Sequence, residues 1–147
     1  MEALDVGALT LDFRSMRIDI VTLFPEICRA PLNESMMKRA QESGALDLHI
    51  HNLRDWTTDK HHTVDDAPFG GGQGMVMKPE PVFAAVESLR AENSFAVLMT
   101  PQGRRLTQAL AREFSTRPHL IIICGHYEGI DHRVGEHLAH AEISIGD

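Results

Sequence analysis

The sequence has only two cysteines, Cys28 and Cys124. They form no CxxC pair, and no histidines stand around either of them at the spacing of zinc ligands. This excludes the common cysteine-based metal and redox motifs. We expect two buried thiols with a packing role.

Long apolar runs are also missing. The longest stretch without a polar residue lies at residues 81–86, whereas a helix that spans a bilayer needs about 20 apolar residues. No charged start followed by an apolar core and a cleavage site marks a secretory signal. The sequence therefore predicts a cytoplasmic protein that does not enter the membrane.

Positive charge is scarce. Against 21 aspartates and glutamates stand 14 lysines and arginines, for a formal net charge of -7. This balance argues against a broad basic face that coats nucleic acid, although it leaves room for a local groove. At 147 residues, with 43% hydrophobic and 24% charged residues, the chain has the size and composition of one globular domain.

Two nucleotide-binding motifs are absent. A P-loop requires GxxxxGK[ST], but no glycine in the chain is followed by lysine. The dinucleotide-binding fold requires GxGxxG directly after its first strand, and here the first strand-like run, RIDIVTLF, is followed by no glycine before Gly44. The same absence counts against the common Rossmann-type methyltransferases.

Strand-like and helix-like periods alternate along most of the chain. We expect strands at residues 17–24, 46–53, 95–100, 119–124 and 141–145, and helices at 26–43, 79–91, 106–115 and 130–140. This order predicts an α/β fold with a mainly parallel sheet flanked by helices. The run HLIIIC, residues 119–124, is apolar at successive positions, which indicates a strand buried on both faces.

Local signals refine these boundaries. Gly44 stands where the first helical region should end in a left-handed residue, and Pro31 allows a break inside that region. Residues 1–15 show no clear period, so we interpret them as a leader or a misassigned start and residues 16–147 as the domain.

One long segment, residues 54–78, fits neither period. At about 25 residues it exceeds an ordinary connection, and such loops are generally functional or disordered. It contains HTVDDAPFGGGQGM, with Asp65 and Asp66 shortly before four glycines, Gly70, Gly71, Gly72 and Gly74. A flexible linker, a lid and a surface for a flat ligand such as a base all remain open.

Three loops follow strands of the expected sheet, where ligands of open parallel sheets bind. They are PQGRR at residues 101–105, GHYEGID at 125–131, and Gly146–Asp147. Their glycines and proline either let backbone groups approach a ligand or simply turn the chain. Tyr127 and Glu128, held between two glycines, favour a pocket.

Basic residues near these loops are few: Arg54, Lys60, Arg104, Arg105 and Arg133. They either receive phosphates or are ordinary surface charges. The adjacent pair His61 and His62 lacks the spacing of helix-borne metal ligands, and we identify no metal site.

Five segments together resemble a known family. They are IDIVTLFPE, LRDWTTDKHHTVDDAPFGGGQGM, TPQGRRLTQ, IIICGHYEGIDHRV and ISIGD, spread over residues 16–147. In this order they closely resemble the bacterial tRNA (guanine-N1)-methyltransferases of the SPOUT class. The resemblance implies a deep trefoil knot, an S-adenosylmethionine donor held in the knot, and a homodimer; knots are too rare for composition to suggest one.

The resemblance also implies roles for individual residues. The donor would be held by three loops, comprising Thr100, Pro101, Gln102 and Gly103, then Gly125, Tyr127, Glu128 and Gly129, then Ile145, Gly146 and Asp147. The substrate would be tRNA, methylated at N1 of guanosine 37, just 3′ of the anticodon. Glu128 would frame the guanine as a catalytic residue, and the glycine-rich loop would lie against the extruded base. Asp65, Arg104 and Arg105 complete the expected RNA site.

The sequence departs from the family pattern after ISIGD. In the family, the following stretch completes the knot, then carries the aspartate thought to be the general base and a tRNA-binding domain. We therefore expect an incomplete knot and an inactive fragment. The alternatives are a donor-binding or dimerisation module without catalysis, and a SPOUT methyltransferase that acts on another RNA. The sequence does not decide whether Mg²⁺ takes part.

Overall fold

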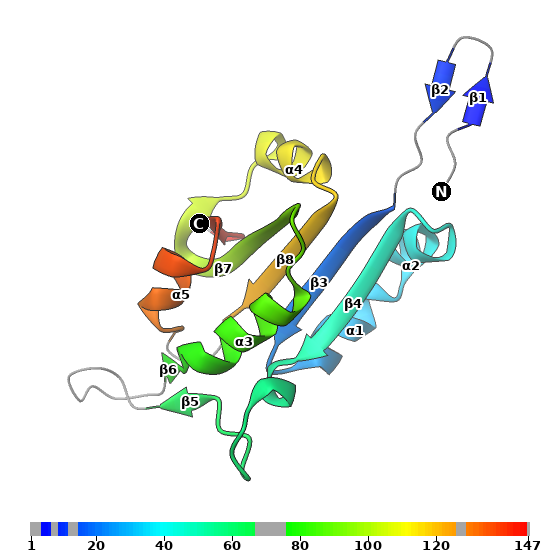
Figure 1. Ribbon diagram of the computed structural model, residues 1–147. Coiled ribbons are helices and arrows are strands. Elements are labelled where there is room, and N and C mark those ends of the chain that lie inside the picture. Colours follow the sequence, from blue (N-terminus) through cyan, green and yellow to red (C-terminus); the bar gives the residue numbers. More distant parts are fainter. Residues whose placement is uncertain (1–3, 7–8, 12–14, 67–75, 126–128, 147) are drawn as a thin grey trace.

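The computed structural model of the protein describes residues 4–6, 9–11, 15–66, 76–125 and 129–146. Its centre is a five-stranded sheet with the strand order β4-β3-β8-β7-β9 (Figure 1). Every neighbouring pair in this sheet is parallel. The strands are β3 (Met16–Thr22), β4 (Leu46–Asn52), β7 (Ser94–Arg105), β8 (His119–Cys124) and β9 (Ala141–Ser144). The α/β fold with a parallel sheet is confirmed, and the trefoil knot stays a prediction.

Helices cover both faces of the sheet. They are α1 (Pro25–Leu32), α2 (Ser35–Glu42), α3 (Pro79–Leu89), α4 (Gln108–Ser115) and α5 (His132–His137), with a short 3₁₀ helix η1 (Leu53–Trp56) after β4. Helices α3 and α5 lie in front of the sheet and α1 and α2 behind it (Figure 1). Among the described helices, none is long and apolar enough to cross a membrane.

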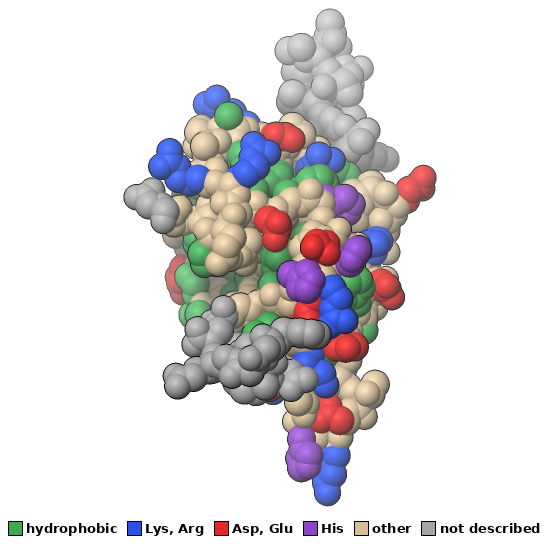
Figure 2. Space-filling model, turned by 90° about the vertical axis from the view of Figure 1, so that its left-hand side faces the viewer, with side chains coloured by type: hydrophobic (Ala, Val, Ile, Leu, Met, Phe, Trp, Pro, Cys, Tyr) green, Lys and Arg blue, Asp and Glu red, His purple; other side chains and the backbone are tan. Residues whose placement is uncertain are grey.

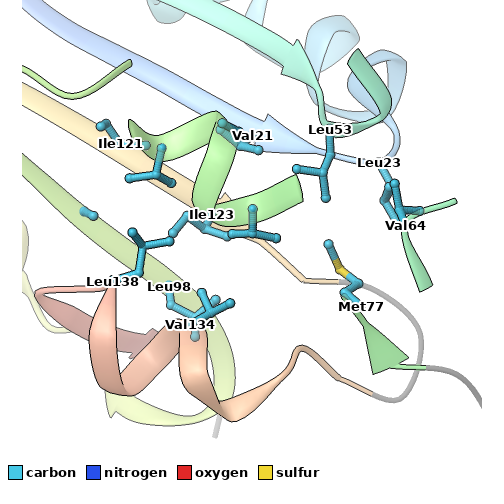
Figure 3. Close-up of a cluster of buried hydrophobic side chains, with 14 residues drawn as sticks. Val21, Leu23, Leu53, Val64, Met77, Leu98, Ile121, Ile123, Val134 and Leu138 are labelled. Atoms are coloured by element: carbon cyan, nitrogen blue, oxygen red, sulfur yellow. The ribbon is translucent and has the colours of Figure 1, made fainter. Parts of the chain in front are cut away.

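The larger core cluster fills the face under α3 and α5. Figure 3 shows Val21, Ile121, Ile123 and Leu98 from three adjacent strands pointing toward the same space as Leu138. A second cluster, built around Val97, Leu110, Leu120 and Ile143, lies on the face under α4. Successive strand residues point to opposite faces, so neighbours such as Val97 and Leu98 serve different clusters. Burial of each large apolar side chain contributes about 1.5–3 kcal/mol.

Strand β8 lies in the middle of the sheet between β3 and β7. Four of its six residues are buried, namely His119, Leu120, Ile121 and Ile123. Because both faces of this strand are covered by helices, the prediction from HLIIIC is confirmed.

The expected helix over 26–43 is wrong as a single element. Helix α1 contains Pro31 near its end, and the chain restarts as α2 at Ser35, whose φ is 54°. The helix is therefore interrupted at Asn33, two residues after Pro31. Gly44 has a φ of 80°, which confirms the predicted left-handed residue after the helical region.

Residues outside the main sheet form two small antiparallel pairs. In the first, β1 (Leu4–Val6) pairs with β2 (Leu9–Leu11), in the part of the chain expected to have no clear period. This hairpin projects away from the sheet (Figure 1). In the second, β5 (Asp65–Asp66) pairs with β6 (Val76–Met77), on either side of the glycine-rich loop.

Candidate active site at the carboxyl edge of the sheet

The carboxyl ends of β8, β7 and β9 lie side by side in the sheet. In the register of the sheet, Met99 of β7 pairs with Cys124 of β8 on one side and with Ile143 of β9 on the other. Because all three strands run in the same direction, the residues that follow them lie at the same edge. A Cβ atom added to Gly125 would lie 3.8 Å from the carbonyl oxygen of Met99. The three strand ends are therefore neighbours at one edge of the sheet, and a pocket formed by the loops that follow them stays a prediction.

Strand β7 does not end at Thr100, so the prediction of a plain loop over 101–105 is wrong. The strand continues to Arg105, but its register with β9 shifts, since both Met99 and Arg104 pair with Ile143. The residues between them, Thr100–Gly103, form an irregular excursion from the ladder. Such bulges commonly re-aim backbone groups beside a functional site.

Gly103 makes this excursion possible. A Cβ atom at position 103 would lie 2.5 Å from the backbone carbon of Glu142 and 2.5 Å from the backbone nitrogen of Ile143. Only a residue without a side chain allows the two backbones to approach so closely. The requirement comes from packing against β9, which the sequence alone did not reveal.

Short-range hydrogen bonds fix the first and third loops. The Thr100 hydroxyl donates to Oε1 of Gln102 at 2.5 Å. At the end of β9 the backbone N–H of Gly146 donates to Oγ of Ser144 at 3.2 Å. The exposed residues of these loops are Pro101, Gln102, Gly125, Ile145 and Gly146.

A fourth segment joins this edge. The backbone N–H of Met77 donates to the carbonyl of Gly129 at 3.0 Å, and the N–H of Asp131 donates to the carbonyl of Met77 at 3.2 Å. Met77 pairs on its other side with Asp65, so β6 lies between Asp65 and the loop after β8. Gly70, Gly71, Gly72, Gly74, Tyr127, Glu128 and Asp147 lie outside the described residues.

Comparison with known proteins decides the family. Residues 16–147 match the model of the family described as tRNA (Guanine-1)-methyltransferase TrmD. The chain belongs to the TrmD family.

Curated relatives of this chain agree with the family assignment. It is 56% identical over 132 residues to a tRNA (guanine-N(1)-)-methyltransferase of Carboxydothermus hydrogenoformans, covering 90% of this chain and 52% of the relative. It is 56% identical over 135 residues to the enzyme of the same name from Chloroflexus aggregans, covering 90% and 53%. For the Staphylococcus epidermidis enzyme the identity is 53% over 133 residues, covering 90% and 54%. The chain spans about half the length of these relatives.

The loop after β8 is joined to α5 by a capping carboxylate, that of Asp131. The Asp131 carboxylate accepts from the backbone N–H of Arg133 at 2.9 Å and from its guanidinium at 2.7 Å. The hydrogen bond from the Arg133 side chain is the main reason that the pKa of Asp131 is lowered to about 2. The carboxylate therefore stays ionised and holds the start of α5 in place.

A buried polar network was missed at the sequence level. The Asp19 side chain has no exposed surface and accepts from Nε of Arg17 at 2.8 Å. It also interacts with Nε2 of His51 at 2.7 Å and with Nε2 of His119 at 2.6 Å. An ionised carboxylate can only accept, so both Nε2 atoms carry the hydrogen. Burial opposes ionisation of Asp19, but these hydrogen bonds outweigh it and lower its pKa to about 2.

One residue of β3, Asp19, could have indicated this network from the sequence. Asp19 stands two residues before the buried Val21 and therefore shares its face. A single acid on the inward face of a strand needs buried partners. Local sequence patterns do not reveal that His51 and His119, from the two flanking strands, are those partners.

The expected full burial of the two cysteines is wrong. Cys28 and Cys124 are each partly exposed and not disulfide-bonded. Burial raises the pKa of Cys124 to about 11, and a hydrogen bond with Cys28 adds to the effect. The Cys124 thiol, directly before Gly125, therefore stays protonated near neutral pH.

Proposed function

We propose that the protein transfers a methyl group from S-adenosylmethionine to N1 of guanosine 37 in tRNA, just 3′ of the anticodon. The observation that carries this proposal is that Met99 pairs with both Cys124 and Ile143, at the ends of three neighbouring strands. It brings together the three loops that the family resemblance assigns to the donor. A tRNA substrate also implies a cytoplasmic protein.

The donor would be held by backbone groups of the three loops. S-adenosylmethionine supplies an activated methyl group on a positively charged sulfur. The residues that would hold it are Thr100, Pro101, Gln102, Gly103, Gly125, Tyr127, Glu128, Gly129, Ile145, Gly146 and Asp147. Those that the structure describes fit this role, because Pro101, Gln102 and Gly125 are exposed beside the excursion that Gly103 allows.

The substrate guanine would enter beside the hairpin β5–β6. N1 of neutral guanine carries a proton, so an acceptor must remove that proton as the N1–methyl bond forms. Glu128 is proposed to hold the base, and the resemblance assigns proton removal to an aspartate that follows position 147 in the family. An unpaired anticodon-loop base is readily extruded into such a site. Asp65 and the glycine-rich loop would line it, and the exposed Arg104 and Arg105 would meet phosphates.

We further propose that the protein acts as a homodimer. Several large apolar side chains are exposed, including Ile27 at 69%, Met36 at 79% and Ile145 at 78%. Neither α1 nor α2 contains a buried residue. Burial of this surface against a second copy would remove apolar area from water. Sedimentation analysis tests this, since a purely monomeric protein would contradict it.

The activity is best tested in a chimera, because the chain spans about half the length of its relatives. Residues 1–147 would be joined to the part of the Carboxydothermus hydrogenoformans enzyme that follows the matched segment. With S-adenosylmethionine and a tRNA that has guanosine at position 37, we expect N1-methylguanosine, detected by mass spectrometry of the digested RNA.

Two controls make the result decisive. The same tRNA with adenosine at position 37 should gain no N1-methylguanosine. The relative itself should methylate the guanosine-containing tRNA under the same conditions. If the relative is active while a folded chimera leaves this tRNA unmodified, the proposed activity is wrong.

A further inference from the structure

A pocket lies between η1, the following turn and the start of α3. Its volume is about 230 Å³, and its lining includes Trp56, Thr58, Asp59, Lys78, Glu80 and Ala84. Pockets for whole small-molecule ligands usually measure about 300–1,000 Å³. The size therefore suits a smaller group, such as one flat base.

The turn that forms one wall of this pocket is held firmly. The Asp59 carboxylate accepts from the backbone N–H of Thr63 at 2.9 Å and from its hydroxyl at 2.6 Å. These hydrogen bonds, led by that from the Thr63 side chain, lower the pKa of Asp59. Arg54 donates to the carbonyl of His62 at 3.2 Å. The wall is thus formed before any ligand arrives, which reduces the entropic cost of binding.

The same turn projects from the lower end of the molecule (Figure 1). At its tip Lys60, His61 and His62 are exposed. The projecting end of the molecule carries basic and histidine side chains next to acidic ones (Figure 2). The exposed ammonium group of Lys60 beside the pocket is suited to a phosphate that flanks a bound base.

Trp56 supplies a fixed aromatic surface. Its Nε1–H donates to Oγ of Ser88 on α3 at 3.0 Å. Its ring meets the ring of His51 edge to face, with centroids 5.6 Å apart. The indole is therefore anchored on two sides while part of it lines the pocket. Aromatic side chains of this kind are where unpaired bases of RNA bind.

The backbone links this pocket to the loop after β8. Lys78 lines the pocket, and its backbone N–H donates to the carbonyl of Val64 at 2.7 Å. The preceding residue, Met77, donates to the carbonyl of Gly129 in the loop after β8. One peptide bond thus separates a residue of this pocket from a contact with the donor loop. A nucleotide next to the methylated one would be within reach of the pocket.

We propose that this pocket receives the base of a second unpaired nucleotide of the RNA substrate, and this rests on the proposed function. The base lies against Trp56 and Ala84. The carboxylates of Asp59 and Glu80 favour a base that bears an exocyclic amino group, because such groups donate hydrogen bonds. The ammonium group of Lys78 meets a flanking phosphate, which two carboxylates alone would repel.

The test uses the fluorescence of Trp56, the only tryptophan in the 147-residue chain. An RNA stem-loop with the anticodon-loop sequence is titrated into the chain without S-adenosylmethionine. We expect saturable quenching of Trp56 emission. The variant Ala84→Leu fills the pocket from an exposed position on α3. It should weaken RNA binding about tenfold, as expected for loss of one base–aromatic contact.

Ala84→Ser is the matched control, because it keeps the space free and should bind RNA as the parent chain does. Circular dichroism should show the same helix content in all three chains. Unchanged emission at saturating RNA, or equal affinities of Ala84→Leu and the parent chain, would overturn the proposal. The readout needs no methyl transfer. A chimera that methylates tRNA while Trp56 does not respond would reject this pocket only, and the reverse result would reject only the methyltransferase activity.

Discussion

Gly103 of β7 and Glu142 of β9 approach each other so closely that a Cβ atom at position 103 would lie 2.5 Å from the Glu142 backbone carbon. This contact holds the excursion of β7 against the neighbouring strand. It also aligns the first of the proposed donor loops with the third, because Ile145 and Gly146 follow directly after β9.

Gly103→Ala should disrupt this contact. The added methyl group meets backbone atoms, which cannot rotate away, so we expect a loss of about 2 kcal/mol in the free energy of unfolding. Affinity for S-adenosylmethionine should fall at least about tenfold as the first loop moves. Urea denaturation and calorimetry measure the two effects. Gly125→Ala is the matched control for stability, since its Cβ would meet the nearest atom at an ordinary 3.8 Å. Equal stability of both variants would contradict this account of Gly103.

Asp19→Asn should make the stability depend less on pH. The pKa of Asp19 in the folded protein is about 2, below the ordinary value of 3.8, so its ionised form stabilises the fold. This contribution, about 2 kcal/mol, is fully present above about pH 4 and is lost as the pH falls towards about 2. Urea denaturation should therefore show the variant less stable than the parent at neutral pH, with the difference shrinking in acid. Asp47→Asn, at a carboxylate that is 52% exposed, serves as the control. A difference that stayed constant over this range would exclude the ionised Asp19 as the cause.

Glu128→Gln should slow methylation in the chimera. If Glu128 holds the guanine as proposed, loss of its charge should lower kcat/KM for tRNA about a hundredfold. Initial rates with saturating donor measure this. The comparison is Glu136→Gln on α5, where the side chain is 61% exposed and has no proposed role. Equal rates for the two variants would show that Glu128 has no role in the reaction.

Gly72→Val should weaken the use of tRNA without weakening the binding of S-adenosylmethionine. The glycine-rich loop is proposed to lie against the extruded base, so a branched side chain there should raise KM for tRNA about tenfold. Affinity for S-adenosylmethionine should stay within about twofold, because the donor loops are other segments of the chain. Calorimetry with the donor and steady-state kinetics with tRNA give the two numbers. Parallel loss of both would indicate general misfolding instead.

The local pattern of the sequence was enough to predict much of the fold. Runs such as HLIIIC have the composition and position of a central strand, and β8 occupies the residues expected of it. The end of the first helical region at Gly44 also follows from a local conformational preference. These features depend on residues close together in the chain, so periodicity and turn chemistry reveal them.

The details of the site depend on the strand order instead. Nothing in the periodicity of residues 94–105 indicates that the strand continues past Thr100 beside β9, because that pairing involves residues about 40 positions away.

The sequence by itself determined the family and the parallel α/β class, since both follow from short runs of neighbouring residues. Only the tertiary structure decided that β8 inserts between β3 and β7. That insertion brings His119 to Asp19 and Cys124 to Met99. The physical reason is that such contacts are set by how whole strands pack their two faces, and no local stretch of sequence fixes that choice.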